Sequence, residues 1–474
     1  MIVPQPRLLF WTGVVILPFS ALAALLPATM IVSIAFMSAF IVFVIADAAL
    51  ASGRLKGIRV AFPEIVRLAK DREGILEIGI QNNRADKRRL RIALSLPAEF
   101  CSPHEEVLAV LPEGSVDSRV SWPFTALKRG NYVFENAYLE ANSPVGFWAI
   151  RKTSPARAEV RVYPNTLREQ KGLAALFLNR GMLGLHAQRQ VGKGKEFEKL
   201  REYIPGDSYE DIHWKATAKR SHPITKVFQI ERTQEVYVII DSSRLSARSI
   251  EEPSPNSGTS CHAPANPGAT ANPGTPCRMV SPDLQSATQL ERFVTAAMVL
   301  GLVAEKQGDL FGLLAFDDQV RAFIRARNGK AHYGLCRDAL YTLQPKMANP
   351  DFGEAFSFIR LRLRRRALLI FLTNLDDPVL AEHFVRNLDI LGRRHLVLVN
   401  VLTSTGVAPL FSDPRVATAD DLYERMGGHI QWQQLRELER VLKRRGVSMT
   451  LLNNEMMCPQ LVSQYVNVKR RQLL

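Results

Sequence analysis

The stretch that decides the fold of the larger part of this chain reads Val236-Tyr237-Val238-Ile239-Ile240-Asp241-Ser242-Ser243. A mostly apolar run that ends at a carboxylate is typical of a buried strand in a parallel sheet, where ligands bind beyond the carboxyl ends. Similar strands follow and alternate with amphipathic helical patterns. Strands are expected at 310–316, 367–372, 396–401 and 447–451, and helices at 284–306, 333–343, 378–391, 430–445 and 459–473. This alternation predicts a parallel sheet flanked by helices.

The region before this stretch has a different rhythm. Residues 75–80, 90–96 and 158–163 alternate apolar and polar side chains, and turn residues such as those at 128–131 separate such runs. Alternation with period two is typical of half-buried strands. We therefore expect a small antiparallel β-sandwich.

The N-terminal region is the most apolar part of the chain. No charged residue occurs between positions 8 and 46, and a bilayer core needs about 20 apolar residues per helix. Two spans, at 8–26 and 30–49, therefore fit, and Pro27 marks the break between them. A cleaved signal peptide at Ala21-Leu22-Ala23 is the alternative, but it leaves the second span unexplained. The sequence predicts a tight hairpin of two transmembrane helices.

Basic residues flank both ends of this hairpin. Arg7 precedes the first span, and Arg54, Lys56 and Arg59 follow the second. Lys and Arg are enriched on the cytoplasmic side of membrane helices. We therefore expect an inner-membrane protein with two spans and with its soluble bulk in the cytoplasm. Asp47, near the end of the second span, is expected to be a solvated residue at the membrane boundary.

These patterns divide the chain into four parts. They are a transmembrane hairpin with its flanks (1–56), a β-sandwich domain (57–165), a connecting segment (166–233) and an α/β domain (234–474). Residues 246–283 consist largely of Pro, Asn, Gly, Ser and Thr, which predicts a disordered insertion. Because this insertion leaves the chain beside the strand end at Asp241, we expect it to shield or regulate that face.

Charge and cysteine use narrow the function classes. The net charge of +15 suits either nucleic acid or an anionic membrane surface. Zinc-knuckle spacing, an arginine-rich arm and an aromatic-interleaved basic stripe are all missing from the sequence, which argues against nucleic acid. Basic clusters at 360–366 and 443–445 are expected to be solvated helix ends, with contact to anionic lipid or an acidic partner as the alternative. The five cysteines are scattered, which fits a reducing compartment.

Asp241 and Ser243 are the candidate metal ligands. They match the first two positions of the Asp-x-Ser-x-Ser pattern that holds Mg²⁺ in metal-ion-dependent adhesion sites, but Leu245 occupies the third. Asn374 stands where a second carboxylate is expected, and residues 349–351 offer no Thr. The pattern is thus degenerate. It leaves two interpretations open, a weak Mg²⁺ site or a carboxylate that caps a strand end or is a relic of such a site, and no other cofactor is expected.

The connecting segment is rich in glycine, aromatic and charged residues. Its glycine pair at 192–194 lacks the second glycine and the Lys-Ser/Thr of a P-loop, and Pro205-Gly206-Asp207 is a turn pattern. Trp214 is expected to be a core or interdomain anchor. His213 could act as a base only with a partner that the sequence does not identify.

Together these motifs resemble the bacterial domain-of-unknown-function family 58. The resemblance rests on 129–132, 143–148, 192–207, 212–219 and the strand ending at Asp241. Its most specific residues are Glu196, Phe197, Leu200, Arg201, Tyr203, Pro205, Gly206, Asp207 and Trp214. Glu210 and His213 depart from the family pattern, which has a basic residue and Asp there, and Thr217 and Lys219 replace Ser and Arg.

The resemblance implies a von Willebrand factor type A-like, Rossmann-like α/β domain. It also implies frequent coding beside a MoxR-type AAA+ ATPase and a transglutaminase-like protein, but no known reaction. Because the sequence shows no catalytic constellation, we expect a non-enzymatic scaffold that binds partner proteins, such as that ATPase and neighbouring membrane proteins, during assembly or maturation of other proteins. The alternatives are a metal-dependent binding or enzymatic site at Asp241 and Ser243, and a charge-driven nucleic-acid binder.

Overall fold

The computed structural model describes residues 1–84, 86–167, 169–170, 172, 191–205, 208–229, 234–250, 287–391, 394–404, 406–410 and 419–471. Residues up to Asn165 form one compact unit, and the described residues from Thr166 onward form a second. Each unit is built around its own core.

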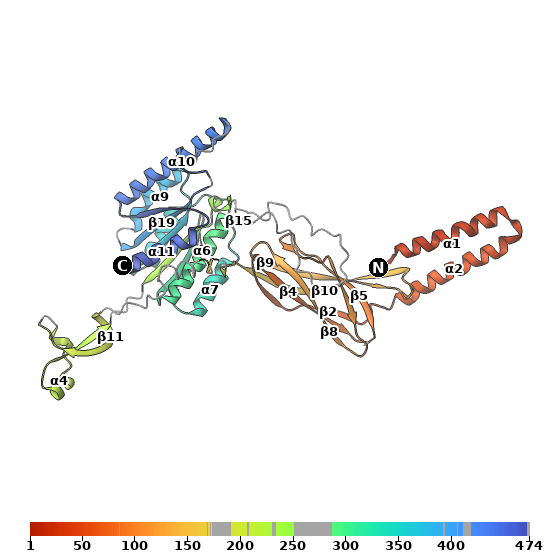
Figure 1. The fold of residues 1–474 in the computed structure, drawn as a ribbon, viewed down its shortest axis with the longest axis horizontal. Helices are drawn as coiled ribbons and strands as arrows, with labels where there is room; N and C mark the ends of the chain where they lie inside the picture. The colour runs from red at the N-terminus through yellow and green to blue at the C-terminus, as the bar shows by residue number, and fades with distance from the viewer. Residues whose placement is uncertain are drawn as a thin grey trace. The chain divides into compact units, whose positions relative to one another are not determined.

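The first unit begins with a helical hairpin. Helix α1 (Pro6–Leu25) and helix α2 (Met30–Ala51) are joined by the short 3-10 helix η1 (Pro27–Thr29). They lie side by side as the red pair in Figure 1. Both are long and apolar enough to cross a membrane, and only 6% and 11% of their apolar windows are buried. The two predicted spans are therefore helices with apolar, exposed surfaces, which fits a membrane anchor.

Two mainly antiparallel sheets follow the hairpin. One has the order β1 (Ile2–Pro4), β10 (Trp148–Tyr163), β9 (Gly130–Asn142), β5 (Arg88–Leu94), β7 (Glu106–Leu111), with β3 (Ile65–Ala69) also on β10. The other has the order β2 (Ile58–Ala61), β4 (Glu73–Asn82), β8 (Asp117–Ala126), β6 (Phe100–Cys101). The pairing of β3 with β10 is parallel.

The alternating sequence pattern explains how these two sheets share a core. Along β4 every second side chain is buried, so one face of the strand is apolar. Leu76 and Ile78 of this strand belong to the same core cluster as Ile92 and Leu139 of the other sheet. The alternation thus brings the apolar faces of both sheets together and leaves their polar faces to solvent.

The second unit contains a six-stranded sheet. Its order is β17 (Val320–Arg327), β16 (Leu310–Phe316), β13 (Glu235–Asp241), β18 (Leu368–Thr373), β19 (Leu396–Leu402), β20 (Ser448–Leu452). All neighbouring pairs are parallel except β16–β17. The central strands are buried along nearly their whole length, which is why they appear in the sequence as continuous apolar runs rather than alternating ones.

Helices cover both faces of this sheet, as Figure 1 shows. The helices are α6 (Gln289–Lys306), α7 (Lys330–Leu340), α8 (Phe352–Arg362), α9 (Pro378–Leu391), α10 (Ala419–Arg444) and α11 (Met457–Arg470). One core cluster contains residues of α6, α7 and α11, and a second contains residues of α8, α9 and α10. Alternate residues of β13 enter the two clusters, Val238 the first and Ile239 the second. The sheet therefore separates two apolar cores.

Most elements of this unit lie where the sequence predicts them. Strand β17 and helix α8 were not expected, and α10 begins before the predicted start at residue 430. Strand β17 is a half-exposed edge strand with arginines between its apolar residues, so its pattern resembles a polar loop. Residues 246–250, which the prediction assigned to the insertion, belong to the fold, since β14 (Ser249–Ile250) pairs with β15 (Ala287–Thr288). Residues 251–283 of that insertion lie outside the described residues.

A buried carboxylate ties the last helix to the sheet. Asp309 is 1% exposed. It accepts hydrogen bonds from the Gln234 backbone N–H at 3.2 Å and from the Tyr465 hydroxyl, and it pairs with the Lys469 ammonium at 2.8 Å. Tyr465 and Lys469 both belong to α11. Because a buried charge needs a partner, this cluster positions α11 against the start of β16.

Candidate functional site

The carboxyl ends of three neighbouring strands bring the predicted site together. Asp241 is aligned with Phe316 of β16, and Ile240 with Leu372 of β18. Asp317 and Thr373 therefore lie at the same edge as Asp241. In parallel sheets flanked by helices this edge is the usual place for ligands.

Asp241 is held from two sides. Its Oδ1 accepts a 2.9 Å hydrogen bond from the Ser243 backbone N–H, and its Oδ2 accepts a 2.7 Å bond from the Thr373 hydroxyl. The Ser243 hydroxyl oxygen accepts a 3.3 Å bond from the Leu245 N–H. The side chains of Asp241, Ser243 and Thr373 are completely buried. Both carboxylate oxygens thus have partners inside the protein.

Burial also changes the proton affinity of this carboxylate. Removal from water raises the pKa of Asp241 above its ordinary value, and the nearby carboxylate of Asp317 adds to the increase. Hydrogen bonds from Ser243 and Thr373 act in the opposite direction, because they stabilise the charged form. Desolvation is the largest of these effects. A carboxylate in this setting accepts a proton more readily than a solvated one.

A second acidic pair lies beside this cluster. Asp317 Oδ2 binds Arg321 Nε at 2.5 Å, and Asp318 binds the Lys346 ammonium at 2.8 Å. A hydrogen bond with the Asp317 side chain and the ammonium of Lys346 lower the pKa of Asp318 to about 2. The Asp318 carboxylate is therefore ionised and paired at neutral pH.

Ion pairs and an amide hydrogen bond connect side chains around the carboxyl ends of these strands. Arg248 contacts Asp376 at 2.8 Å, and Arg244 contacts Asp377 at 3.9 Å. Asn374 donates a 3.4 Å hydrogen bond to Gln289 Oε1. This asparagine, at the position where a second carboxylate was expected, therefore takes part in the local packing.

As a metal site the set is small. Asp241 supplies one carboxylate, and Ser243 and Thr373 supply hydroxyls, whereas Mg²⁺ prefers six oxygen ligands, several of them often water. Within the described residues there is no group of three or more His, Cys, Asp or Glu side chains suited to hold a metal ion. The sequence interpretation of Asp241 as a strand-end cap agrees with its hydrogen bonds.

The second unit also contains a cysteine close to a histidine. Cys336 Sγ lies 3.7 Å from His332 Nε2 on helix α7, and that nitrogen contacts the Phe311 carbonyl oxygen at 2.8 Å. Both side chains are buried, and burial raises the pKa of Cys336 to about 12. The thiol therefore stays protonated at neutral pH and is a poor nucleophile.

The segment that carries the family resemblance forms a hairpin of β11 (Val191–Glu202) and β12 (Ile224–Gln229). The 3-10 helix η3 (Tyr209–Asp211) and helix α4 (Trp214–Arg220) lie between these strands. The His213 ring accepts a 3.0 Å hydrogen bond from the Ala216 N–H through Nδ1. His213 therefore caps a helix start, which gives it a structural role.

Two aromatic side chains of this segment face solvent. Trp214 is 70% exposed and Tyr209 is 76% exposed, and the Tyr209 ring stacks on Tyr203 with centroids 6.0 Å apart. The expectation that Trp214 is a core residue is therefore wrong, and its alternative role as an interdomain anchor stays a prediction. Helix α4 has seven residues, and none of them is buried.

The other resemblance residues spread along the same hairpin. Glu196, Phe197, Leu200 and Arg201 belong to β11, and Tyr203 and Pro205 follow it. Gly206 and Asp207 lie outside the described residues, so the predicted turn stays a prediction.

Sequence reasoning missed several members of the strand-end cluster. Thr373, Asp317 and Ser246 were not predicted, although Ser246 donates a 2.8 Å hydrogen bond to the Ser243 carbonyl. The position of Thr373 could have marked it as a strand-end residue, since it directly follows the apolar strand predicted at 367–372. Asp317 likewise follows the strand predicted at 310–316. Neither position could be paired with Asp241 before the strand order was known.

Likenesses to solved structures are weak. Proximal thread matrix protein 1 from the mussel byssus is 10% identical, with a TM-score of 0.25, over 48% of this chain and 43% of that protein. The CARDB domain of a Pyrococcus furiosus protein, in complex with di-metal ions, is 11% identical, with a TM-score of 0.16, over 22% and 91%. The sialic acid binding region of a Streptococcus sanguinis adhesin is 9% identical, with a TM-score of 0.16, over 40% and 53%.

This chain spans less than half the length of the mussel protein. No curated protein matches the chain. The model of the family described as protein of unknown function DUF58 matches residues 199–253 and 281–407. These ranges include the exposed Trp214, the strand that ends at Asp241, and Thr373. This part of the chain, from residue 199 to residue 407, therefore carries the DUF58 family match.

Proposed function

We propose that this protein is a non-enzymatic scaffold of the inner membrane, whose cytoplasmic part binds a partner protein during assembly or maturation of other proteins. Helices α1 and α2 anchor it. The two mainly antiparallel sheets of the first unit act as a β-sandwich spacer, and the second unit acts as a von Willebrand factor type A-like domain. The partner is a MoxR-type AAA+ ATPase, in keeping with the gene neighbourhood that the family resemblance implies.

The exposure of Tyr209 and Trp214 is the observation that carries this proposal. Large aromatic side chains are enriched at protein interfaces and among the residues that dominate binding energy. These two lie in the segment with the most specific family residues, and more than two thirds of each is exposed. An aromatic pair on the outside of a family-defining segment is suited to contact a partner.

The buried strand end supports a binding role over a catalytic one. The carboxylate of Asp241 has both oxygens bonded within the protein, and the Cys336 thiol is buried with a raised pKa. Exposed apolar side chains follow the ends of these strands instead, Met347 on the loop before α8 and Val379 in the first turn of α9. Met347 is 81% exposed and Val379 is 67% exposed. This edge therefore offers a second surface for protein contact.

A pull-down of the tagged full-length chain from bacterial membranes tests the proposal. The informative variant is Tyr209→Ala/Trp214→Ala, and the matched control is Tyr423→Ala on α10, whose ring is 71% exposed. We expect mass spectrometry to recover a AAA+ ATPase with the wild type and the control but not with the double variant. Recovery that survives the double change would place the interface elsewhere, and absence of any AAA+ ATPase from the wild-type sample would refute this partner.

A metal-dependent site at Asp241 and Ser243 is the second candidate function. The observation in its favour is Thr373, which adds a hydroxyl 2.7 Å from the carboxylate and so supplies the kind of ligand that residues 349–351 lack. Calorimetric titration of the full-length protein with Mg²⁺ and Mn²⁺, beside Asp241→Asn, separates the two candidates. Binding heat that disappears in the variant would support the metal site, and no heat in either protein would remove it.

A further inference from the structure

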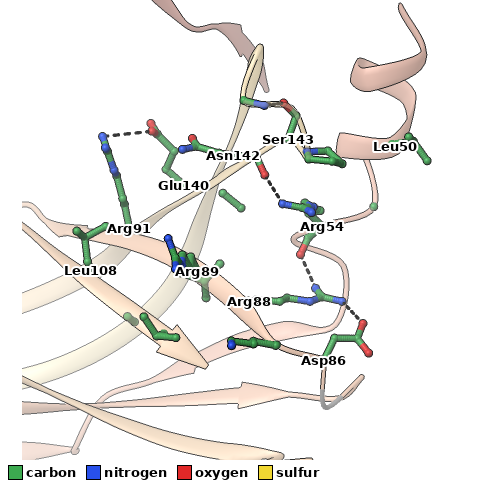
Figure 2. Close-up of a pocket in the computed structure, with 18 of the residues that line it drawn as sticks. Leu50, Arg54, Asp86, Arg88, Arg89, Arg91, Leu108, Glu140, Asn142 and Ser143 are labelled. Atoms are coloured by element: carbon green, nitrogen blue, oxygen red, sulfur yellow. Dashed lines mark hydrogen bonds and ion pairs between the residues drawn. The ribbon is translucent and has the colours of Figure 1, made fainter. Parts of the chain in front are cut away.

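A cavity of about 950 Å³ lies in the first unit, beside the end of the helical hairpin. Its wall combines residues from four places in the chain, namely the hairpin ends, the loop before β5, strands β5 and β7, and the segment from Glu140 to Gly146. Figure 2 shows Arg54, which follows α2, beside Arg88 of β5, and Leu50 at the end of α2 above them. The cavity therefore exists only because the hairpin end and the sheet meet.

The charge of this cavity is strongly one-sided. Two carboxylates, Asp86 and Glu140, line it together with seven basic residues. The basic residues are Arg7, Arg54, Arg84, Lys87, Arg88, Arg89 and Arg91. Seven positive charges less two negative ones leave an excess of five. Such an excess in a concave wall attracts anions.

The two carboxylates are already used by neighbouring arginines. Asp86 pairs with Arg88 at 3.0 Å, and Glu140 pairs with Arg151 at 2.7 Å and with Arg91 at 3.9 Å. Arg54 donates a 2.7 Å hydrogen bond to the Asn142 carbonyl oxygen, as Figure 2 shows.

Four basic side chains of the wall are left for a ligand. Arg7, Arg84, Lys87 and Arg89 have no carboxylate partner among the described residues, and all four are exposed. Several guanidinium groups that converge on one cavity are suited to bind phosphate, since each presents a fork of N–H donors.

Apolar side chains border the same wall. Leu50, near the end of α2, and Leu108 of β7 are each 68% exposed, and Val110 is 58% exposed. A site for a soluble phosphate has no use for exposed leucines at its edge. A phospholipid needs both features, because its phosphate is charged and its glycerol and acyl chains are apolar.

The hairpin and the sheet are joined at a fixed position. Trp148 Nε1 donates a 3.0 Å hydrogen bond to the Val44 carbonyl oxygen, and the Val145 N–H donates a 3.2 Å bond to Asp47 Oδ1. Asp47 is 2% exposed, so it is a buried connector and not the solvated boundary residue expected from the sequence. These bonds hold the basic wall at the membrane end of α2, where lipid headgroups lie.

We propose that this cavity binds the headgroup of an anionic glycerophospholipid from the leaflet around the hairpin. The phosphate contacts the arginines and Lys87, and the start of the acyl chains lies along Leu50 and Leu108. This inference rests on the membrane anchoring of the proposed function and is independent of the partner protein. A bound lipid would orient the sheets of the first unit against the membrane surface.

Native mass spectrometry of the full-length protein tests this site. The protein is reconstituted in nanodiscs of equimolar phosphatidylglycerol and phosphatidylcholine, released, and the retained lipid is identified by mass. The variant Arg84→Gln/Lys87→Gln/Arg89→Gln removes three exposed charges from the wall. The control Arg360→Gln/Arg364→Gln/Arg365→Gln removes three exposed charges from the second unit. The two variants therefore have the same net charge.

We expect the wild type and the control to retain phosphatidylglycerol in preference to phosphatidylcholine. The wall variant should lose this preference by about a hundredfold, since each basic residue near an anionic headgroup contributes severalfold. Equal preference in the wall variant and the wild type would overturn the proposal. Displacement of the lipid by equal concentrations of glycerol 3-phosphate or inorganic phosphate would also overturn it and assign the cavity to a soluble anion. The Tyr209→Ala/Trp214→Ala protein should keep its lipid, so failure of the partner proposal leaves this result unchanged.

Discussion

The hydroxyl of Thr373 donates a 2.7 Å hydrogen bond to Oδ2 of Asp241, and both side chains are completely buried. This bond joins the carboxyl ends of two parallel strands, β18 and β13. Hydrogen bonds to charged groups contribute more to stability than neutral ones do. The pair therefore stabilises the sheet edge at which a ligand or partner protein would bind.

Replacing Thr373 by Val should destabilise this edge. Valine has nearly the same shape, but it leaves Asp241 Oδ2 without its donor, and we expect a loss of about 1–3 kcal/mol. Amide hydrogen exchange of β13 and β18 in the full-length protein measures this local loss. Thr373→Ser keeps the hydroxyl and is the matched control. Equal protection in the Val and Ser variants would show that the bond contributes little.

The raised pKa of Asp241 predicts the direction of its pH dependence. The folded state binds this proton more tightly than the unfolded chain does, so the stabilisation is fully present at low pH. It is lost as pH rises from the unfolded pKa to the raised folded pKa. Asp241→Asn removes this titration. The melting temperature of the variant should therefore rise relative to that of the wild type as pH increases.

Thermal unfolding followed by fluorescence between acidic and slightly basic pH checks this expectation. The variant Asp241→Ala is the comparison, because it leaves the Ser243 N–H without its acceptor and should be less stable than Asp241→Asn at every pH. A wild type that gains stability over Asp241→Asn with rising pH would indicate a lowered pKa, as for a carboxylate paired with a cation.

Loss of the Lys469 charge should weaken the contact of α11. Lys469→Met leaves the buried Asp309 with the Tyr465 hydroxyl and one backbone N–H as its remaining partners among the described residues. Breaking such a pair costs about 3 kcal/mol when the remaining charge stays buried. Hydrogen exchange of α11 should increase accordingly. Lys443→Met on α10 removes an exposed charge and should change stability by less than about 0.5 kcal/mol, and equal effects of both changes would contradict the role of Asp309.

Cys336 should react slowly with alkylating reagents in the folded protein. Burial raises the pKa of its thiol to about 12, so little thiolate exists at pH 8. We expect iodoacetamide to modify Cys336 only after denaturation, as judged by peptide mass spectrometry. Cys101, which is partly exposed, reports on reagent activity in the same sample. Rapid native labelling of Cys336 would reopen the Cys336–His332 pair as a nucleophile.

Local patterns made many of the helices and strands of this protein predictable. The apolar runs at 8–26 and 30–49 became α1 and α2, and the strand predicted at 310–316 became β16 with the same limits. Strand β17 was missed because its three arginines interrupt the apolar pattern. The prediction of a core position for Trp214 was wrong because a large apolar side chain usually becomes buried, whereas this one is 70% exposed.

The sequence by itself determined the apolar helical hairpin, the alternation of strands and helices, and the family resemblance, because each depends on residues that are close together in the chain. Only the tertiary structure decided that Thr373 contacts Asp241 and that Arg7, Arg54 and Arg89 line one cavity. Such contacts depend on the order of strands in a sheet and on how a hairpin end meets it. These arrangements follow from the packing of whole apolar faces. Residues from distant parts of the chain contribute to each face, so no short stretch of sequence predicts the contacts.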